Sequence, residues 1–257
     1  MKLELVQKNF LVTGASRGIG RAIAERLLRE EANVWLTARG QEQLEQTIKE
    51  LGLRFGEGRV IGCPTDCADE SALQELLQQI TKKWNRLDGV VANVGDGRSV
   101  SDAIPNTEQW SKVWQTNFDT ALNSARVVLP LLQESRGNLL FISSITGLEA
   151  IGAPVAYSTA KTAVIAFAQN LARKVAPEVR VNVIAPGNVH FPESSWEEKI
   201  KANSEKVEQM LQATVPMKRF GTPEEIADAA TFLCSVRASF ITGSVLVVDR
   251  GQTVSLL

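Results

Sequence analysis

Short apolar runs rich in β-branched residues alternate with longer helical patterns from one end of the chain to the other. The runs are continuous rather than alternating in polarity, which is typical of strands with helices on both faces. Regular alternation of such strands with helices requires parallel crossover connections. The sequence therefore predicts an α/β fold, a doubly wound Rossmann-type parallel sheet of about seven strands with helices on both faces.

The predicted elements follow one another without a linker rich in Pro, Gly or Ser, so a single domain is expected over residues 1–257. The strands are expected at residues 10–13, 34–37, 59–62, 89–93, 138–142, 179–184 and 244–248. The helices are expected at about 19–31, in a Gln- and Glu-rich stretch ending at 51, at 69–84, as one long helix through 110–122, at 158–176, and from Pro223 onward behind a capping box of Thr222 and Glu225. The exception to this rhythm is 188–218, where Trp196, Ile200, Val207 and Leu211 are expected on one helical face.

Composition excludes several classes of protein. The formal net charge of −1 provides no basic field for nucleic acid or an anionic membrane surface. The chain contains no apolar run near the ~18 residues that span a bilayer, and its N-terminus does not resemble a signal peptide. Cys63, Cys67 and Cys234 lack metal-ligand spacing, so we expect reduced thiols, no metal site and a cytoplasmic location.

Three glycines lie where the first strand passes into the first helix: Gly14, Gly18 and Gly20. Glycine at this junction lets the backbone approach a diphosphate, which then rests on the helix N-terminus. The residues expected to contact the cofactor here are Gly14, Ser16, Arg17, Gly18, Ile19 and Gly20. Across the crevice, Asn93 and Gly95 follow the fourth strand.

Asp66 and Cys67 follow the third strand and are further candidates for cofactor contact. The Asp66 carboxylate is placed to approach an adenine edge, or to cap a turn or helix. Both alternatives remain open from the sequence.

The residues after the second strand indicate which nicotinamide is bound. A carboxylate there would select NAD through the ribose hydroxyls, but the first acid is Glu42. Arg39 stands there instead, and Arg17 in the phosphate loop is a second cation. Guanidinium groups suit a 2′-phosphate, so NADP(H) is favoured over NAD(H), the alternative being that both arginines are solvated.

Tyr157 is the only tyrosine, and Lys161 follows it by one helical turn. A free phenol has a pKa of about 10. A neighbouring ammonium is expected to lower the pKa of Tyr157, so that the phenol exchanges a proton with a substrate oxygen. Ser144, after the fifth strand, is expected to hydrogen-bond the same oxygen. The set predicts carbonyl or alcohol redox chemistry.

Over essentially its whole length the chain resembles the short-chain dehydrogenase/reductase family, in its compact single-domain form, and is similar to 3-oxoacyl-carrier-protein reductases. The matching motifs are the TGASRGIG loop at 13–20, Asp66, the turn at 92–95, Asn117, Ser144, Tyr157, Lys161 and Pro186-Gly187. The resemblance implies a catalytic tetrad in which Tyr157 is the acid/base, Lys161 also holds the nicotinamide ribose and Asn117 anchors a water. It further implies cofactor contacts at Pro186, Gly187 and Val189.

The resemblance also implies a substrate lid at about 188–218 and a homotetramer or homodimer. The expected contacts between subunits are the long helices after the fourth and fifth strands, the last strand, and the final residues Val254, Ser255, Leu256 and Leu257. The expected pocket-lining residues are Phe191, Trp196, Met210, Leu148 and Ile151, each of which ordinary packing explains equally well. Arg98 is a candidate for meeting an acidic substrate, and His190 is predicted to be a loop residue without a catalytic role.

Four positions depart from the family pattern. Ala92 and Val94 replace Asn and Ala after the fourth strand, so an amide that helps to brace the sheet is missing. Phe191 stands where a threonine usually contacts the cofactor, with Ser194 or Ser195 as possible replacements. Arg250 replaces a glycine, and a surface or subunit-contact role is expected for it.

The function predicted from the sequence is an NADP(H)-dependent oxidoreductase. It transfers a hydride between the nicotinamide and a small-molecule carbonyl or secondary alcohol, with Tyr157 as general acid/base. The alternative is a non-catalytic dinucleotide-sensing or scaffold protein on the same fold, for which an intact acid–base set has no use. A nucleotide-sugar epimerase or dehydratase is a third alternative, and it normally requires a larger C-terminal substrate domain.

Overall fold

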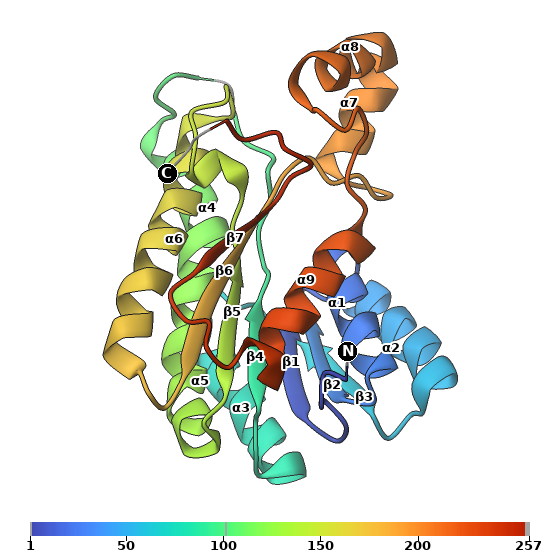
Figure 1. Cartoon of the computed structure of the whole chain (residues 1–257), viewed down its shortest axis with the longest axis vertical. Helices are drawn as coiled ribbons and strands as arrows, with labels where there is room; N and C mark the ends of the chain where they lie inside the picture. The colour runs from blue at the N-terminus through green and yellow to red at the C-terminus, as the bar shows by residue number, and fades with distance from the viewer. Residues whose placement is uncertain (1, 101, 255–257) are drawn as a thin grey trace.

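The computed structural model describes residues 2–100 and 102–254, which form one seven-stranded sheet with helices on both faces (Figure 1). The strand order is β3-β2-β1-β4-β5-β6-β7, and every neighbouring pair is parallel. The order reverses at β1, which pairs with β2 on one side and β4 on the other. Open α/β sheets bind ligands at such a switch point. The predicted fold class is confirmed.

The elements agree with the expected ones within a few residues. The strands are β1 (Asn9–Thr13), β2 (Asn33–Ala38), β3 (Val60–Pro64), β4 (Gly89–Ala92), β5 (Asn138–Ile142), β6 (Arg180–Pro186) and β7 (Val245–Val248). The helices are α1 (Gly18–Arg29), α2 (Gln41–Phe55), α3 (Glu70–Trp84), α4 (Thr107–Trp114), α5 (Thr120–Ser135), α6 (Val155–Val175), α7 (Ser195–Ala202), α8 (Ser204–Thr214) and α9 (Pro223–Cys234), with short segments η1 (Gln115–Asp119), η2 (Ile145–Gly147) and η3 (Val236–Ala238).

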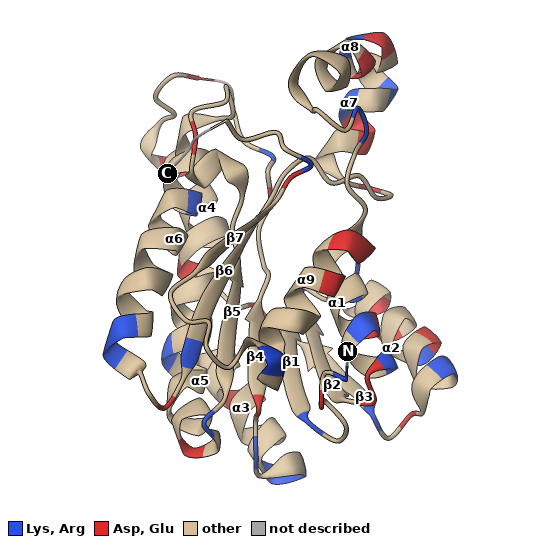
Figure 2. Cartoon of the chain, viewed as in Figure 1, with Lys and Arg blue, Asp and Glu red and all other residues tan. Residues whose placement is uncertain are grey.

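Two hydrophobic clusters hold the layers together. One packs α1, α2 and α9 on the first face of the sheet, and the other packs α3, α5 and α6 on the second. Consecutive residues of β1, β4 and β5 are buried, because strands covered on both faces expose neither side to water. Charged residues lie mainly on the outer helices, the connecting loops and the α7–α8 region (Figure 2).

Several helices begin at the polar caps that the sequence supplies. Asp69 accepts hydrogen bonds from the backbone N–H groups of Ser71 and Ala72 at the start of α3. Thr222 and Glu225 form the predicted capping box of α9, with Pro223 in its first turn. These local signals fix where the helices start.

The connection from β4 to β5 differs from the single long helix that was predicted. A five-residue π-helical segment, η1, separates α4 from α5, and Asn117 lies within it. A π segment widens the turn by one residue and is common at functional sites. The prediction of an unbroken helix is wrong because periodicity in the sequence does not register one inserted residue.

The stretch between β6 and α9 forms α7 and α8, which stand apart from the layers near the carboxyl ends of the strands (Figure 1). Its small core consists of Val207, Leu211 and Val215, with Trp196 and Ile200 packed against it. The four predicted residues do pack together, but from two helices, α7 and α8, rather than from one helical face. Of the expected C-terminal contact, residues 255–257 lie outside the described part of the chain.

Candidate active site

A cavity of about 450 Å³ opens at the carboxyl ends of the strands, beside the switch point. Most of the predicted site residues line it: Gly14, Ser16, Arg17, Ile19, Arg39, Asp66, Cys67, Asn93, Gly95, Ser144, Tyr157, Lys161, Pro186, Gly187 and Val189. Gly18, Gly20 and Asn117 do not line the cavity. The fold thus brings segments from six strand ends, those of β1 to β6, to one place.

The end of β4 is tied directly to the phosphate loop. The Asn93 side chain donates to the backbone carbonyls of Thr13 at 3.0 Å and Gly14 at 3.1 Å. The Thr13 hydroxyl accepts from the Asn93 backbone N–H at 3.0 Å. Ala92 is packed in the hydrophobic core. Asn93 therefore braces the crevice although position 92 carries no amide.

Asp66 and Cys67 line the cavity at the end of β3. The Asp66 carboxylate accepts from the backbone N–H of Ala68 at 2.9 Å, so it caps the turn after β3. It also lines the cavity, and the adenine contact stays a prediction. Burial raises the pKa of the Cys67 thiol to about 12, so this side chain remains an uncharged thiol at neutral pH.

Tyr157 and Ser144 meet on the wall that β5 and α6 form. Ser144 follows β5, and its oxygen accepts from the backbone N–H of Thr146 at 3.2 Å. Helix α6 begins at Val155, three residues earlier than predicted, so Tyr157 lies in its first turn. The Ser144 hydroxyl lies near enough to Tyr157 to lower its pKa, and both side chains line the cavity. Two hydroxyl groups therefore face the cavity together.

Lys161 lies over one face of the Tyr157 ring. Its Nζ is 5.9 Å from the ring centroid and donates to the Ile142 carbonyl at 3.2 Å. Burial lowers the pKa of Lys161 from its usual 10.5 to about 8.

The pKa of Tyr157 is raised, which corrects the expectation that Lys161 lowers it. The main cause is desolvation, because protein encloses the ring except where it opens on the cavity. The Asp96 carboxylate also raises the pKa, and the Ser144 hydroxyl opposes both effects. Tyr157 is therefore a protonated phenol at neutral pH.

The Asn117 side chain holds the loop after β4 through two hydrogen bonds to the Asp96 backbone. Its Oδ1 accepts from the Asp96 backbone N–H at 2.9 Å, and its Nδ2 donates to the Asp96 carbonyl at 3.1 Å. A Cβ on Gly95 would lie 2.8 Å from the Lys161 Nζ and 3.1 Å from the Asn117 Oδ1. A larger residue at position 95 would have to displace these side chains, so the β4 turn, η1 and α6 pack closely together.

Phe191 and Trp196 line the cavity as predicted, from the segment that leads into α7. The Phe191 ring rests on the phosphate loop, where a Cβ on Gly18 would lie only 2.6 Å from it. The other three expected pocket residues do not line the cavity. Leu148 and Ile151 are 42% and 39% exposed on the surface, and Met210 packs in the α8 core.

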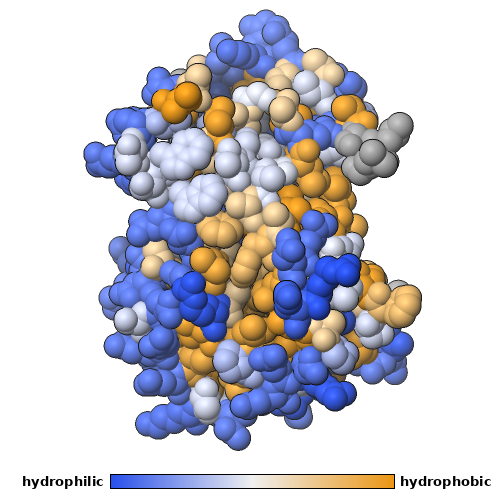
Figure 3. All heavy atoms as spheres, turned by 90° about the vertical axis from the view of Figure 1, so that its left-hand side faces the viewer, coloured by the Kyte–Doolittle hydropathy of each residue, from blue (hydrophilic) through white to orange (hydrophobic). Residues whose placement is uncertain are grey.

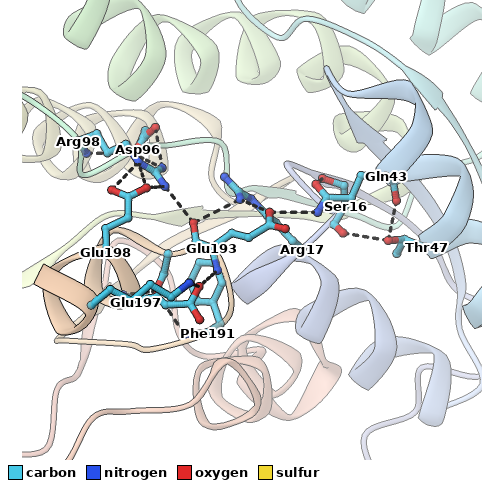
Figure 4. A network of polar contacts seen from close by, with 12 residues as sticks. Ser16, Arg17, Gln43, Thr47, Asp96, Arg98, Phe191, Glu193, Glu197 and Glu198 are labelled. Atoms are coloured by element: carbon cyan, nitrogen blue, oxygen red, sulfur yellow. Dashed lines mark hydrogen bonds and ion pairs between the residues drawn. The ribbon is translucent and has the colours of Figure 1, made fainter. Parts of the chain in front are cut away.

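Two arginines near the cavity are ion-paired with the segment around α7 (Figure 4). Arg17 Nη1 lies 2.8 Å from the Glu193 carboxylate. Arg98 binds Glu198 at 2.7 Å and Asp96 at 3.2 Å, so it is not a free cation for an acidic substrate. Sequence analysis missed Glu193, because no local pattern signals a contact between residues 176 positions apart.

His190 and Arg250 lie behind this segment. The His190 ring packs against Phe220, in agreement with its expected role as a loop residue. The Arg250 side chain is only 9% exposed and forms an ion pair with Glu225, the capping residue of α9. The expected surface or subunit-contact role for Arg250 is wrong, because the chain itself covers the guanidinium.

No helix within residues 2–100 and 102–254 is long and apolar enough to cross a membrane. In the same part of the chain no group of His, Cys, Asp and Glu is arranged to hold a metal ion. The three cysteines are free thiols.

A doubly wound sheet, a glycine-spaced loop at its switch point and a serine–tyrosine–lysine set across the crevice define a Rossmann-type oxidoreductase. A family model described as enoyl-(acyl carrier protein) reductase matches residues 14–253. The chain belongs to this family and is a compact short-chain dehydrogenase/reductase.

Similar proteins act on different substrates. The chain is 32% identical to a 3-oxoacyl-[acyl-carrier-protein] reductase of Aquifex aeolicus, over 98% of this chain and 100% of that protein. It is 33% identical to glucose 1-dehydrogenase 2 of Bacillus subtilis, over 98% and 97% of the two chains. The crystal structure of L-sorbose reductase from Gluconobacter frateurii, complexed with NADPH and L-sorbose, superposes with a TM-score of 0.92 at 29% identity and covers both chains fully.

Proposed function

We propose that this protein is an NADP(H)-dependent oxidoreductase that reduces a ketone or, in reverse, oxidises a secondary alcohol. The observation that carries the proposal is that Ser144, Tyr157 and Lys161 line the same cavity, with Lys161 one helical turn along α6 from Tyr157. A sensor or scaffold protein needs no such pair of hydroxyl groups at the nicotinamide end of the crevice. We therefore favour catalysis over the non-catalytic alternative.

The residues present fit a dinucleotide with a 2′-phosphate. The N-terminus of α1 opens on the cavity, and helix N-termini favour phosphate groups. Arg39 lines the cavity after β2 and forms no ion pair with any carboxylate of the described residues. Arg39 and Arg17 would hold the 2′-phosphate, Asn93 and the phosphate loop the diphosphate side, and Lys161 the nicotinamide ribose. Four similar solved structures contain NADP or NADPH, which supports this choice, and one contains NADH.

In this mechanism NADPH supplies the hydride, and the protein supplies position and the proton. Ser144 donates a hydrogen bond to the carbonyl oxygen of the substrate, and Tyr157 donates its phenolic proton to the same oxygen as negative charge develops there. The buried Lys161 ammonium stabilises the phenolate that remains. Asn117 keeps the Asp96 backbone and the Gly95 turn in place beside Lys161. Because the phenol of the free protein is protonated at neutral pH, it already carries the proton that reduction of a ketone consumes.

The proposal also covers the domain organisation, the substrate lid, the compartment and the assembly of the protein. Residues 1–257 act as one domain that binds the cofactor and carries the chemistry, and 188–218 acts as the substrate lid. The substrate is a small carbonyl compound or alcohol, and the compartment is the cytoplasm. The partner is a second copy, in a homodimer or homotetramer. Apolar side chains gather in a band on the face that carries α4 and α6 (Figure 3), and Val247 on the edge strand β7 is 37% exposed.

The test is a nicotinamide absorbance assay with NADPH or NADH and ketones of varied size and charge. We expect turnover with NADPH, and a loss of at least about 10³-fold in kcat for Tyr157→Phe, which keeps the ring and removes the only proton donor of this kind. NADPH binding by Tyr157→Phe should remain within a few-fold of wild type.

Retained turnover in Tyr157→Phe would exclude Tyr157 as the proton donor. Equal turnover with NADH would exclude a preference for NADP(H) through Arg17 and Arg39. Thr146→Val is the matched control. It removes the hydroxyl that lies 3.1 Å from Ser144 Oγ but leaves both reacting hydroxyls in place, so we expect a loss of about tenfold or less.

A further inference from the structure

We propose that Glu193 competes with the cofactor's 2′-phosphate for Arg17 and thereby lowers the protein's affinity for NADP(H) relative to NAD(H). This inference rests on the proposed NADP(H) function and adds a specificity-determining residue outside the predicted cofactor site. Figure 4 shows Glu193 reaching from the segment before α7 to the phosphate loop.

The Glu193 carboxylate lies between the two segments expected to hold the 2′-phosphate. One carboxylate oxygen is 2.8 Å from Arg17 Nη1, at the N-cap of α1. The same oxygen accepts from Gln43 Nε2 at 3.5 Å, in the first turn of α2. Gln43 in turn accepts from the Ser16 hydroxyl at 3.3 Å. The carboxylate thus bridges the phosphate loop and the turn that follows Arg39.

The backbone around Glu193 is held in this position from both sides. The Glu193 carbonyl accepts from Arg98 Nη2 at 2.9 Å and from Arg17 Nη1 at 3.3 Å. The neighbouring Phe191 ring packs on Gly18. Glu193 itself has φ 62°, a conformation that non-glycine residues seldom adopt. The contact with Arg17 is therefore part of how this segment closes over the cavity.

A phosphate and a carboxylate need the same face of a guanidinium group, because both bind through paired N–H donors. The 2′-phosphate must therefore displace the Glu193 carboxylate before it can pair fully with Arg17. NADH carries hydroxyl groups at this position and leaves the ion pair intact. Removing the charge of Glu193 should improve NADPH binding selectively.

The expected effect is modest because the ion pair is open to solvent. The side chains of Arg17 and Glu193 are 41% and 65% exposed. Exposed pairs contribute little, so we expect Glu193→Gln to lower the Kd for NADPH by about two- to fivefold and to change the Kd for NADH by less than about 1.5-fold. The gain should shrink as salt is raised.

The experiment measures equilibrium binding of NADPH and NADH to the full-length protein by calorimetry, without a substrate. Glu205→Gln is the matched control, because Glu205 lies in α8 of the same region and contacts only Gln209 among the residues described. It should leave both Kd values unchanged. An equal gain in Glu205→Gln would show a general charge effect and overturn the inference.

A second comparison places Glu193→Gln in an Arg17→Gln background. If the carboxylate acts through Arg17, the substitution at 193 has no further effect on NADPH binding there. An undiminished gain in that background, or an unchanged NADPH Kd in the single variant, would overturn the inference. Failure of the proposed function is a separate result, seen in the wild-type protein as NADPH binding no tighter than NADH binding, or as no turnover of any ketone.

Discussion

Different forces hold the two walls of the cavity in place. On the β5–α6 wall, Ser144 and Lys161 are 9% and 3% exposed and are fixed by hydrogen bonds to backbone groups. On the side formed by the segment around α7, Glu193 lines the cavity and Glu198 lies nearby; both are more than half exposed and are held by arginines. Buried contacts keep one geometry, whereas exposed ion pairs exchange readily with water, salt or a ligand. The comparison indicates that the chemistry resides on a rigid wall and ligand entry on an adjustable one.

The central sheet and the α7–α8 segment also differ in how much apolar core they contain. The sheet packs between two large hydrophobic clusters, whereas α7 and α8 share a core of three buried residues. Fewer buried apolar contacts give a lower free energy of local opening. We therefore expect the α7–α8 segment to open without disturbing the Ser144–Tyr157 pair.

The largest expected effect concerns Lys161. Its ammonium should be essential for catalysis, whereas its burial should lower the free energy of unfolding. Lys161→Met should reduce kcat/KM by about 10³-fold, because an uncharged side chain cannot stabilise the Tyr157 phenolate. It should leave the free energy of unfolding unchanged or raise it by up to about 2 kcal/mol, since the buried ammonium is removed. Steady-state kinetics and urea unfolding of the same preparation measure both effects.

The sign of the stability effect follows from the lowered pKa of Lys161. Between about pH 8 and 10.5 the folded protein holds fewer protons than the unfolded chain, so this group's contribution to stability rises with pH through that window. At neutral pH its burial costs free energy. A marked loss of stability in Lys161→Met would contradict this account of the rigid wall.

Next in size is a matched pair of leucine deletions, one in each region. Leu140→Ala in β5 should destabilise the protein by about 2–5 kcal/mol, because Leu140 lies in the central core. Leu211→Ala in α8 should cost about 1 kcal/mol or less in global unfolding, because α7 and α8 can open separately. Chemical denaturation measures both, and hydrogen exchange should show faster opening of α7–α8 in the second variant. Equal losses would mean that the two regions unfold as one.

The smallest expected effect is on the pH dependence of reduction. Tyr157 stays protonated and Lys161 charged below about pH 8, so kcat/KM for ketone reduction should be flat there. Above about pH 8 it should fall, approaching tenfold per pH unit, as Lys161 loses its charge. Initial rates at several pH values, with NADPH binding measured alongside, separate this from loss of the cofactor. A profile that stays flat to pH 10 would exclude Lys161 as the titrating group.

Much of the architecture was accessible from the sequence because its signals are local. Continuous apolar strands predict a covered parallel sheet, and the caps at Thr222 and Glu225 predict where α9 begins. The one-turn spacing of Tyr157 and Lys161 puts them on one face of α6. The break at η1 escaped prediction, because a single inserted residue leaves the apolar periodicity nearly unchanged.

The errors concern properties that depend on three-dimensional surroundings. Leu148 and Ile151 have the composition of pocket residues but point to the surface, and Arg250 looks like a surface residue but is covered. The pKa of Tyr157 was predicted from the nearest cation in sequence, whereas desolvation by the whole fold outweighs it.

The order of residues along this chain, by itself, determined the succession of strands and helices, the glycine turn and the residues that can exchange a proton. These features depend on neighbours within a few positions, where backbone geometry allows few arrangements. The tertiary structure alone decided which charges meet across the cavity, how far water reaches Tyr157 and Lys161, and that Glu193 lies against Arg17. Burial and long-range ion pairing arise only when distant segments pack together, so no stretch of sequence specifies them alone.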